Sequence, residues 1–522
     1  MDARGAPLTP PLRRAAAGAA VALAALAAPL AAHVGAPDQW FAGPAGPYAV
    51  RVLIRDPGVV PGWAEVVIRT PPGVAQVGAA PFFWATGPGG APAPDAATAV
   101  PGEPGLWTVR LLFLKTGAYG VRVTIDGAAG RGEVTVPFAA LPRRTLAMDP
   151  ALGAVLGVLG LVLVGGAIAV IGAGSREGTL PPGERPDDAA RVRGRRAMRR
   201  GAVALATGLG IVALWWRVED VVYRRNLYRP WEAAARVEPG PAGGRVLVLE
   251  VTDPRWTDRA RRDWAPLIPD HGKLVHAFLL PADGGPSLAH LHPVPVDSSR
   301  FRAALPPLPA GRWRLFAEFV TEDGLPHTAV ASLALGAPDT AWAPGDADDA
   351  WHAGPAGDGA TRRADLGDGA RVRLVGPAAP VAGAEADLAF EVENSDGAPA
   401  EVEPYLGMAG HAVVAREDGA VFVHLHPAGT ASAAAAAALT VRRLADTARG
   451  AVAGRLAAGD AHAVHAAHAT RAAPARLPGS LRFPWAFPSP GRYRVWVQVK
   501  RGGAIRTAAF ELQVAPGAPA RG

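Results

Sequence analysis

Short apolar runs separated by glycine- and proline-rich turns follow one another along most of the chain. Between residues 33 and 146 these runs lie at 48–54, 64–68, 107–113 and 119–125, and they are rich in β-branched and aromatic residues. Runs of this length and composition are typical of β-strands in a sandwich. We therefore predict a first β domain over 33–146, built as an immunoglobulin-like β-sandwich.

Two later regions repeat this pattern, at 240–337 and 366–515, with a linker rich in Asp, Gly, Ala and Pro at 338–365. Both regions end on a related strand, Gly-Arg-Trp-Arg at 311–314 and Gly-Arg-Tyr-Arg at 491–494. The repeat therefore covers whole domains, and we predict a mainly β protein with three immunoglobulin-like sandwiches. An alanine-rich segment at 428–476 interrupts the last domain, and we interpret it as a low-complexity insert that forms a helix on the outside.

Two apolar runs separate the first β domain from the others. Residues 151–173 carry no charge and exceed the length of about 20 residues that spans a bilayer. Residues 201–216 form a shorter run that ends on Trp215 and Trp216, which suit the membrane interface. The segment between them is rich in arginine, and short arginine-rich loops stay in the cytoplasm. We predict transmembrane helices at 150–174 and 201–217, a cytoplasmic loop at 175–200, and β domains outside.

The first 32 residues resemble a secretory signal. Arg13 and Arg14 precede a short apolar stretch at 15–28, and small residues follow as far as Ala32. This order is typical of a signal peptide that is cleaved after its last small residue. An uncleaved N-terminal anchor is the alternative for 1–32.

Composition narrows the chemistry. The 522 residues include no cysteine, which excludes disulfides, thiolate metal sites and a cysteine nucleophile. The formal net charge is +7, but much of the excess lies in the arginine-rich segment, where membrane topology explains it better than nucleic-acid binding. The sequence lacks a phosphate-binding loop, a nucleophile elbow and a His-Glu-X-X-His motif, so we predict no enzyme and no nucleic-acid partner.

One histidine pattern occurs twice. Each copy has a histidine, an apolar run, a turn containing Asp-Gly, a second apolar run and then His-Leu-His-Pro. Apolar runs around Asp-Gly predict a β-hairpin. A two-residue turn at 418–419 places His411 opposite His426, and a three-residue turn at 283–285 places His276 opposite His292. Because side chains alternate along a strand, the middle histidine of each copy lies on the same face as the opposed pair. The middle histidines are His290 and His424.

Three imidazoles on one face of a hairpin form a candidate metal site. Directly opposed side chains lie about 5 Å apart at Cβ, and neutral imidazole binds copper, zinc and nickel. His271 precedes the first hairpin and Met408 precedes the second, so each is a candidate for a further ligand. A thioether beside three imidazoles favours Cu(I). The alternative is that the histidines are half-exposed and only satisfy local hydrogen bonds.

Other histidines are weaker candidates. His33 becomes the N-terminal residue if the signal is cleaved, and its amine and ring then form a possible metal site. His462, His465 and His468 recur every three residues inside the alanine-rich insert. We expect His327 and His352 at the surface.

The segments Pro-Asp-His-Gly-Lys-Leu-Val-His at 269–276, Ala-His-Leu-His-Pro at 289–293 and Leu-Gly-Met-Ala-Gly-His at 406–411 carry a resemblance, together with 422–429. They resemble uncharacterised bacterial membrane-anchored proteins with YtkA-like and other immunoglobulin-like domains linked to copper handling. The resemblance implies an extracytoplasmic β-sandwich protein that binds a metal, with no established activity. We predict that it lies in the bacterial inner membrane with its domains on the periplasmic side. Such relatives tend to carry a methionine shortly after the second His-X-His-Pro, where this chain has an alanine run near Ala433. That departure makes the second β domain the safer metal site.

Three functions compete. The first is a membrane-anchored extracytoplasmic protein that binds copper, or zinc as the alternative, for metal delivery, buffering or sensing, with a metal-handling protein as partner. The second is a structural or interaction module of the cell envelope without metal. The third is a metalloenzyme with water on three histidines, for which the sequence offers no further sign.

Overall fold

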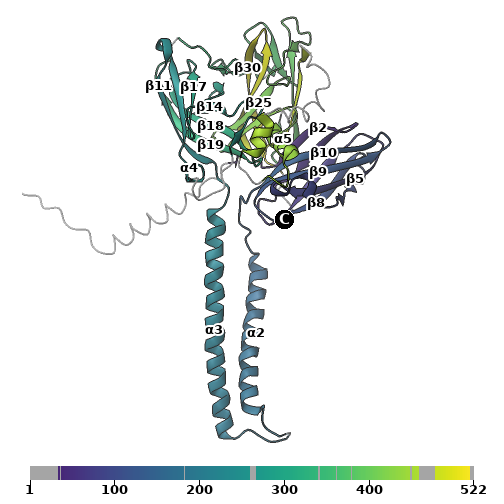
Figure 1. Cartoon of the computed structure of the whole chain (residues 1–522), viewed down its shortest axis with the longest axis vertical. Helices are drawn as coiled ribbons and strands as arrows, with labels where there is room; N and C mark the ends of the chain where they lie inside the picture. The colour runs from purple at the N-terminus through teal and green to yellow at the C-terminus, as the bar shows by residue number, and fades with distance from the viewer. Residues whose placement is uncertain are drawn as a thin grey trace, which may run out of the picture. The chain divides into compact units, whose positions relative to one another are not determined.

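The computed structural model describes residues 33–517, apart from 36, 182, 259–265, 339–340, 360, 378, 447–449 and 458–475. The protein is mainly β, with several sheets and two long apolar helices (Figure 1). The chain divides into two compact units. One contains the β domains, from the described residues of 1–57, 61–140 and 229–522, and the other contains 58–60 and 141–228. The predicted signal segment 1–32 lies outside the described residues.

The first β domain consists of two sheets. One has the strand order β2-β3-β4-β8-β7 and the other the order β10-β9-β5-β6. All four predicted runs form strands, and alternate side chains of β4 are buried, as the polar–apolar alternation requires. The immunoglobulin-like topology stays a prediction. The bounds are β2 (Gln39–Ala45), β3 (Tyr48–Ile54), β4 (Gly62–Arg69), β5 (Val74–Phe83), β6 (Asp95–Ala96), β7 (Thr98–Ala99), β8 (Leu106–Phe113), β9 (Gly117–Gly127) and β10 (Gly130–Ala140).

The second β domain is one continuous sheet that folds around its own core. Its order is β16-β17-β12-β11-β19-β18-β14-β15-β20, and β13 pairs with β18. Strand β11 pairs antiparallel with β12 and, at its start, parallel with β19, so it joins two halves of the sheet. The strands are β11 (Trp231–Pro239), β12 (Arg245–Val251), β13 (Leu267–Ile268), β14 (His276–Pro281), β15 (Leu288–Leu291), β16 (Val294–Pro295), β17 (Arg300–Leu305), β18 (Gly311–Thr321), β19 (Pro326–Leu335) and β20 (Ala350–His352), with a short helix α4 (Pro254–Thr257).

The predicted boundaries of this domain were too narrow. The domain begins at Trp231, which is buried in its core, and not at residue 240. The predicted linker 338–365 is not only a linker, because Ala350–His352 forms β20 and pairs with β15. Strand β20 has only three residues and one buried position, so it lacks the alternation by which longer strands are recognised. The sequence pattern therefore did not predict this edge strand.

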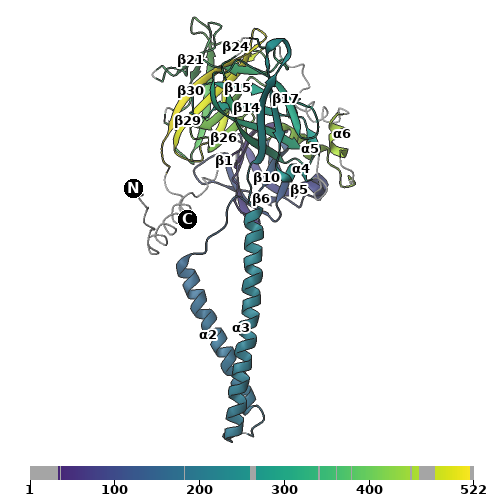
Figure 2. The ribbon, with the colours of Figure 1, turned by 90° about the vertical axis from the view of Figure 1, so that its left-hand side faces the viewer.

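The third β domain packs its core between a five-stranded sheet, β1-β26-β25-β29-β30, and a four-stranded sheet, β21-β22-β23-β28. Figure 2 shows β29 and β30 side by side in this domain. Strand β1 comes from the start of the described chain and pairs parallel with β26. The strands are β1 (His33–Val34), β21 (Arg363–Asp365), β22 (Arg371–Leu374), β23 (Glu385–Glu393), β24 (Glu401–Val402), β25 (His411–Arg416), β26 (Val421–Leu425), β27 (Leu477–Pro478), β28 (Ser480–Ala486), β29 (Gly491–Arg501) and β30 (Ala504–Val514).

The alanine-rich insert does form helices, α5 (Ala433–Val441) and α6 (Ala451–Ala457), but α5 is not on the outside. Its alanines are buried in a cluster that includes Ile268 and Val320 of the second domain. Small side chains allow this close packing, and Ser432 caps the helix by accepting a hydrogen bond from the Ala435 backbone. The prediction of an external helix was therefore wrong. His462, His465 and His468 lie outside the described residues.

The second and third domains meet through the faces of their hairpin sheets. An apolar cluster joins Phe278, Leu280, Leu288 and Phe316 of one domain to Val413, Ala415, Phe422 and Trp496 of the other. Phe316 and Phe422 stack with ring centroids 4.2 Å apart and planes 1° from parallel. The repeated Gly-Arg-aromatic-Arg strand also serves this interface. Arg314 donates to the Glu417 carbonyl, and Arg494 donates to the Gly284 carbonyl.

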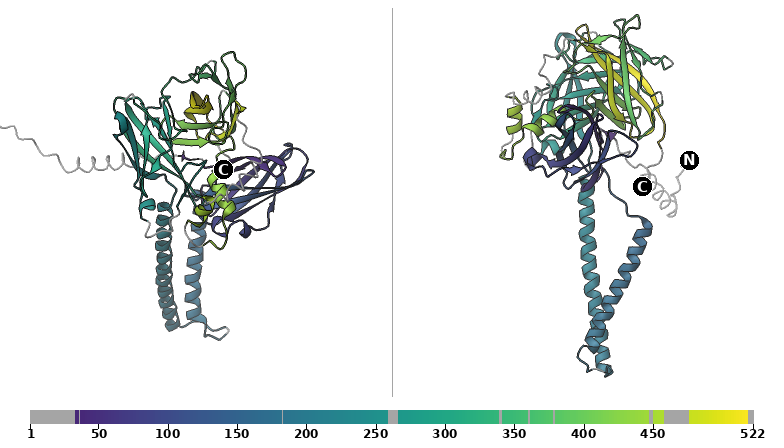
Figure 3. Two further views of the ribbon diagram at one scale, coloured as in Figure 1. Left: turned by 45° about the horizontal axis from the view of Figure 1, so that its top comes forward. Right: turned by 90° about the vertical axis from the view of Figure 1, so that its right-hand side faces the viewer.

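The second unit contains the two long helices, α2 (Pro150–Glu177) and α3 (Asp188–Arg225), which run alongside each other as a hairpin (Figure 3). By length and composition, both are able to cross a membrane. Glycine permits their close approach, because a Cβ at Gly172 would lie 2.4 Å from the Met198 Cγ. The predicted cytoplasmic loop 175–200 is mostly helix, since α3 begins at Asp188. Asp187 caps α3 by accepting a hydrogen bond from the Ala190 backbone at 2.6 Å, and the alanines and arginines that follow are good helix formers.

Candidate metal centre

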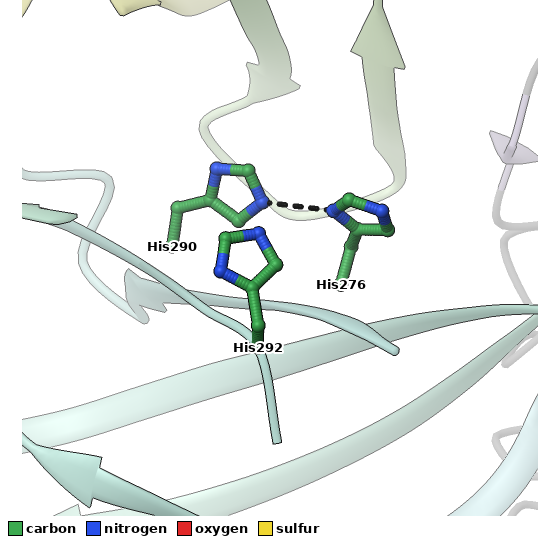
Figure 4. Close-up of side chains that lie close together, drawn as sticks. All are labelled: His276, His290 and His292. Carbon is green, nitrogen blue, oxygen red and sulfur yellow. Dashed lines mark hydrogen bonds between the residues drawn. The ribbon is translucent and has the colours of Figure 1, made fainter. Parts of the chain in front are cut away.

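The first trio of histidines converges as its register predicts. Ala277 pairs with Leu291, which places His276 opposite His292, while Phe278 pairs with His290. Figure 4 shows the three rings turned toward one another. Ligand nitrogens from the three side chains all lie within 4.8 Å of one another, and His290 is fully buried. We call His276, His290 and His292 the first trio.

Each ring of the first trio is held at the nitrogen that faces away from the other rings. His276 Nε2 lies 3.2 Å from the Asp270 carbonyl oxygen, and His292 Nδ1 lies 3.1 Å from Asp349 Oδ1. His290 Nδ1 lies 2.8 Å from Gln498 Oε1. These contacts leave one nitrogen of each ring for a ligand, which is the usual arrangement around metal-binding histidines.

One inward nitrogen of this trio has no hydrogen-bond partner among the described residues, and the other two face each other. His276 Nδ1 and His290 Nε2 lie 3.2 Å apart. Among the described residues, the buried His292 Nε2 has no hydrogen-bond partner. A buried polar atom without a partner costs about 1–3 kcal/mol. A metal ion between the rings would satisfy all three nitrogens, so the donor set fits such an ion.

The second trio has the same construction in the third domain. Ala412 pairs with Leu425, which places His411 opposite His426 and puts His424 on the same face. Ligand nitrogens of these three buried side chains again lie within 4.8 Å of one another. The described residues provide no hydrogen-bond partner for Nε2 of His424 or His426, or for either nitrogen of His411. We call His411, His424 and His426 the second trio.

The turns that join the hairpins differ from the prediction although the register does not. The first ladder ends at the pair Leu279 and Ala289, so the connection is wider than the three residues expected. Leu280 and Pro281 pair instead with the neighbouring β18. In the second copy, residues 417–420 connect the strands, and Gly419 donates to the Arg416 carbonyl. Register survives because the buried faces, and not the turns alone, select it.

His271 lies beside the second trio. Its ring centroid is 4.8 Å from that of His426 and 6.1 Å from that of His411. The prediction had associated it with the first copy because it precedes that hairpin in sequence. His271 has a φ of 49°, in the left-handed region that is uncommon for a non-glycine residue. The interface between the second and third domains places His271 beside His411 and His426.

Met408 occupies the turn of the third domain that corresponds to the one holding His271. Both turns have two consecutive residues with positive φ, His271 and Gly272 in one, Leu406 and Gly407 in the other. Met408 is half-buried and its backbone bonds with Tyr405. The side-chain contacts described for the second trio involve histidines, Tyr405, Glu318 and Phe278. A role for Met408 as a ligand stays a prediction.

Burial lowers the pKa of five of the six imidazoles in the two trios. Desolvation, together with the neighbouring His292, lowers the pKa of His276 to about 3. Desolvation and His271 lower the pKa of His426 to about 3. The pKa values of His290, His411 and His424 are lowered by the same causes, burial first and neighbouring histidines second. Rings that are neutral at physiological pH are ready to bind a metal without releasing protons.

Carboxylates surround the two trios. Burial raises the pKa of Asp270, but the nearby His271, His426 and His276 outweigh it, so the pKa is lowered overall. Desolvation and the charge of Asp270 raise the pKa of Glu318 to about 8. Asp270 also accepts hydrogen bonds from Ser432 and from the Ala434 backbone at the start of α5.

A third group of potential ligands is better explained as an ion pair. Oxygens of Asp346 and Asp349 lie near a nitrogen of His292, all within 4.8 Å. Lys273 Nζ, however, lies 2.5 and 2.7 Å from the two carboxylate oxygens of Asp346 and 3.2 Å from Asp348. Asp349 is already bonded to the ring and backbone nitrogens of His292. These carboxylates are occupied, and they orient the first trio.

Of the histidines whose side chains the structure describes, His327 and His352 are not part of either trio. His33 belongs to β1, whose backbone pairs with Val421. We expected His327 and His352 at the surface, and this expectation is wrong because both side chains are half-buried. The ring of His327 stacks on Trp231 with centroids 3.9 Å apart, which is why the sequence pattern misjudged it.

Sequence reasoning missed the residues that orient the rings. Glu318 and Gln498 occupy equivalent places in β18 and β29, opposite His276 and His411 respectively. Tyr405 Oη lies 3.1 Å from His290 Nδ1. One signal was available: an acidic or amide residue stands at the same position after both Gly-Arg-aromatic-Arg motifs, where a repeated strand otherwise continues apolar.

Comparison with known proteins adds a family model and no function. The model described as "Domain of unknown function (DUF8832)" matches residues 364–447 and 451–516, which include the second trio. No curated protein matches the chain.

Solved structures match only weakly. A tetra-tandem repeat in the extending region of a large adhesion protein has 9% identity and a TM-score of 0.14, covering 87% of this chain and 71% of that one. Chicken CNTN1 FN1-FN3 domains have 11% identity and a TM-score of 0.13, covering 90% and 98%. A putative membrane anchored protein from Corynebacterium diphtheriae has 8% identity and a TM-score of 0.14, covering 90% and 91%. Similarity at this level carries no argument about fold or function.

Proposed function

We propose that this chain is a membrane-anchored, extracytoplasmic protein of the bacterial inner membrane that binds copper for metal delivery, buffering or sensing. The observation that carries the proposal is the convergence of three buried imidazoles in each of two hairpins, with ligand nitrogens within 4.8 Å. In the first trio, every outward nitrogen already has an acceptor. Coordinating histidines elsewhere are oriented in this way.

Copper is the preferred ion because of the donor set. Imidazole suits copper, zinc and nickel, and among divalent ions a given nitrogen site binds Cu²⁺ more tightly than Zn²⁺. The chain has no cysteine to select a thiophilic ion or an iron–sulfur cluster. Zinc is the alternative occupant.

The membrane orientation follows from charge. Arginines 191, 193, 195, 196, 199 and 200 lie in the first part of α3, before its apolar stretch. Arginine near the end of a transmembrane helix favours the cytoplasmic side. Both ends of the helical hairpin that continue into β domains then lie outside the cytoplasm. A periplasmic metal-handling protein is the partner that this location suits.

The test is metal analysis of the full-length protein purified in detergent. We expect stoichiometric copper after loading and removal of excess ion, and a loss of about half in the variant His290→Ala/His292→Ala. His352→Ala, in β20 and outside both trios, is the matched control and should retain the metal of the wild type. Wild-type protein that binds neither added copper nor added zinc would refute the proposal and favour a structural or interaction module.

A further inference from the structure

The two trios are adjacent to each other as well as alike. The ring centroid of His424 lies 5.5 Å from that of His276 and 5.4 Å from that of His290. Within the first trio, ring centroids are 4.7–5.4 Å apart. Rings of different trios are therefore nearly as close as rings of the same trio. The six imidazoles form one continuous cluster at the contact between the two domains.

Each domain also completes the surroundings of the other domain's trio. Gln498 of the third domain lies 2.8 Å from Nδ1 of His290 in the second domain. Reciprocally, Oε2 of Glu318 in the second domain lies 3.3 Å from Nδ1 of His424 in the third. His290 and His424 are the middle histidines of their copies. Neither trio is fully oriented within its own domain.

Apolar side chains close the cluster. The ring of Phe278 stacks on His290 with centroids 4.2 Å apart and lies 4.9 Å from His424. Phe278 belongs to the apolar cluster that joins the two hairpin sheets. Water is thereby kept away from one side of the imidazoles, and electrostatic interactions there are stronger than in solvent.

Two divalent ions this close would repel each other, so nearby negative charge is required. Three carboxylates are placed to supply it: Asp270 beside His271, Glu318 (which a nearby ion must first deprotonate) beside His424, and Asp349 beside His292. Their side chains are 14%, 26% and 1% exposed. Such largely buried carboxylates are screened little by solvent.

From these contacts we infer that the two trios form a single dinuclear metal centre, one ion on each trio, assembled across the interface of the second and third β domains. The inference rests on the proposed metal binding and adds that the ions are bound as an interacting pair. Binding of either ion then holds the two domains together.

The experiment is a Cu²⁺ titration of the full-length protein in detergent, followed by metal analysis and electron paramagnetic resonance. We expect two copper ions per chain and, at full loading, a spectrum broadened or reduced in intensity by the interaction of the two ions. Two variants isolate the trios: His290→Ala/His292→Ala and His411→Ala/His426→Ala. Each should bind one ion and give the full-intensity signal of an isolated Cu²⁺. His352→Ala is the control that should behave like the wild type.

Several outcomes separate this inference from the proposed function. Two bound ions whose spectrum is the sum of the two variant spectra would refute the pair and leave metal binding intact. One ion per wild-type chain would also refute it, because a single ion would then be shared. No bound copper would refute the proposed function itself. If a variant fails to fold, as judged by circular dichroism, the wild-type titration from low to full loading still decides, since only an interacting pair broadens the signal or lowers its intensity per bound copper as the second ion enters.

Discussion

Replacing Gln498 by methionine tests whether one domain orients the metal ligands of the other. Gln498 is fully buried in β29, accepts from His290 Nδ1 at 2.8 Å and donates to Thr507 at 3.1 Å. Methionine has a similar volume but no hydrogen-bonding amide, so both partners lose a bond without a large cavity. Loss of a residue that orients a metal-binding histidine typically weakens metal affinity about 10- to 100-fold, or about 1.4–2.7 kcal/mol.

The expected changes are measurable separately. Copper affinity of the first trio is measured by competition with a chromophoric chelator in protein that carries His411→Ala/His426→Ala, so that a single ion binds. We expect Kd to rise about 10- to 100-fold in the Gln498→Met variant. The metal-free protein should also lose about 1–3 kcal/mol of unfolding free energy, because Thr507 loses a buried partner and His290 Nδ1 keeps only Tyr405 Oη.

Gln498→Glu is the matched control. Glutamate keeps the acceptor oxygen and reproduces the residue found at the equivalent position of the second domain, Glu318. Copper affinity should therefore stay near the value for Gln498. A folded Gln498→Met protein with unchanged Kd would refute the reasoning, because Gln498 would then not be needed to orient His290, whose Nδ1 also lies 3.1 Å from Tyr405 Oη.

Three further predictions concern stability. Metal-free protein should lose stability as the pH falls from 6.5 to about 3. The pKa values of His276 and His426 are lowered to about 3 in the folded protein, so the unfolded chain takes up protons first. Each histidine contributes up to about 1.4 kcal/mol of unfolding free energy per pH unit. Glu318, with its pKa raised to about 8, opposes this trend because its contribution to stability is lost as the pH rises, yet the histidines outnumber it. Equal midpoints of urea unfolding at pH 7 and pH 5 would contradict this prediction. Copper at 100 times Kd should add about 2.7 kcal/mol of stability, seen as a higher melting temperature in calorimetry that a chelator reverses; an unchanged melting temperature would count against binding to the folded state. Phe316→Ala should lower the free energy of unfolding by denaturant by about 3–5 kcal/mol, because it removes the stack on Phe422. The control Leu444→Ala changes a side chain that is 75% exposed and should alter the free energy of unfolding by no more than about 0.5 kcal/mol. Equal effects of the two substitutions would mean that the domain interface contributes little to stability.

Strand positions and hairpin registers were readable from the sequence because they depend on neighbours along the chain. Period-2 alternation places His290 and His292 on one face, and Leu291 between them points into the opposite core. The pairing of His276 with His292 follows from the buried faces of the two runs, so it survived a turn wider than expected. The arginine-rich segment was misread as a loop because charge alone was considered, while Asp187 and the alanines after it begin a helix.

The sequence by itself determined that each hairpin carries three histidines on one face, that the domain is duplicated, and that two segments are apolar enough to span a membrane. Tertiary structure alone decided that the two histidine faces meet, that Gln498 and Glu318 each serve the other domain's ring, and that His271 lies beside His426. The physical reason is distance along the chain. Contacts across a domain interface join residues more than a hundred positions apart, and they depend on which apolar faces pack together, such as Phe316 on Phe422. No local pattern records that choice.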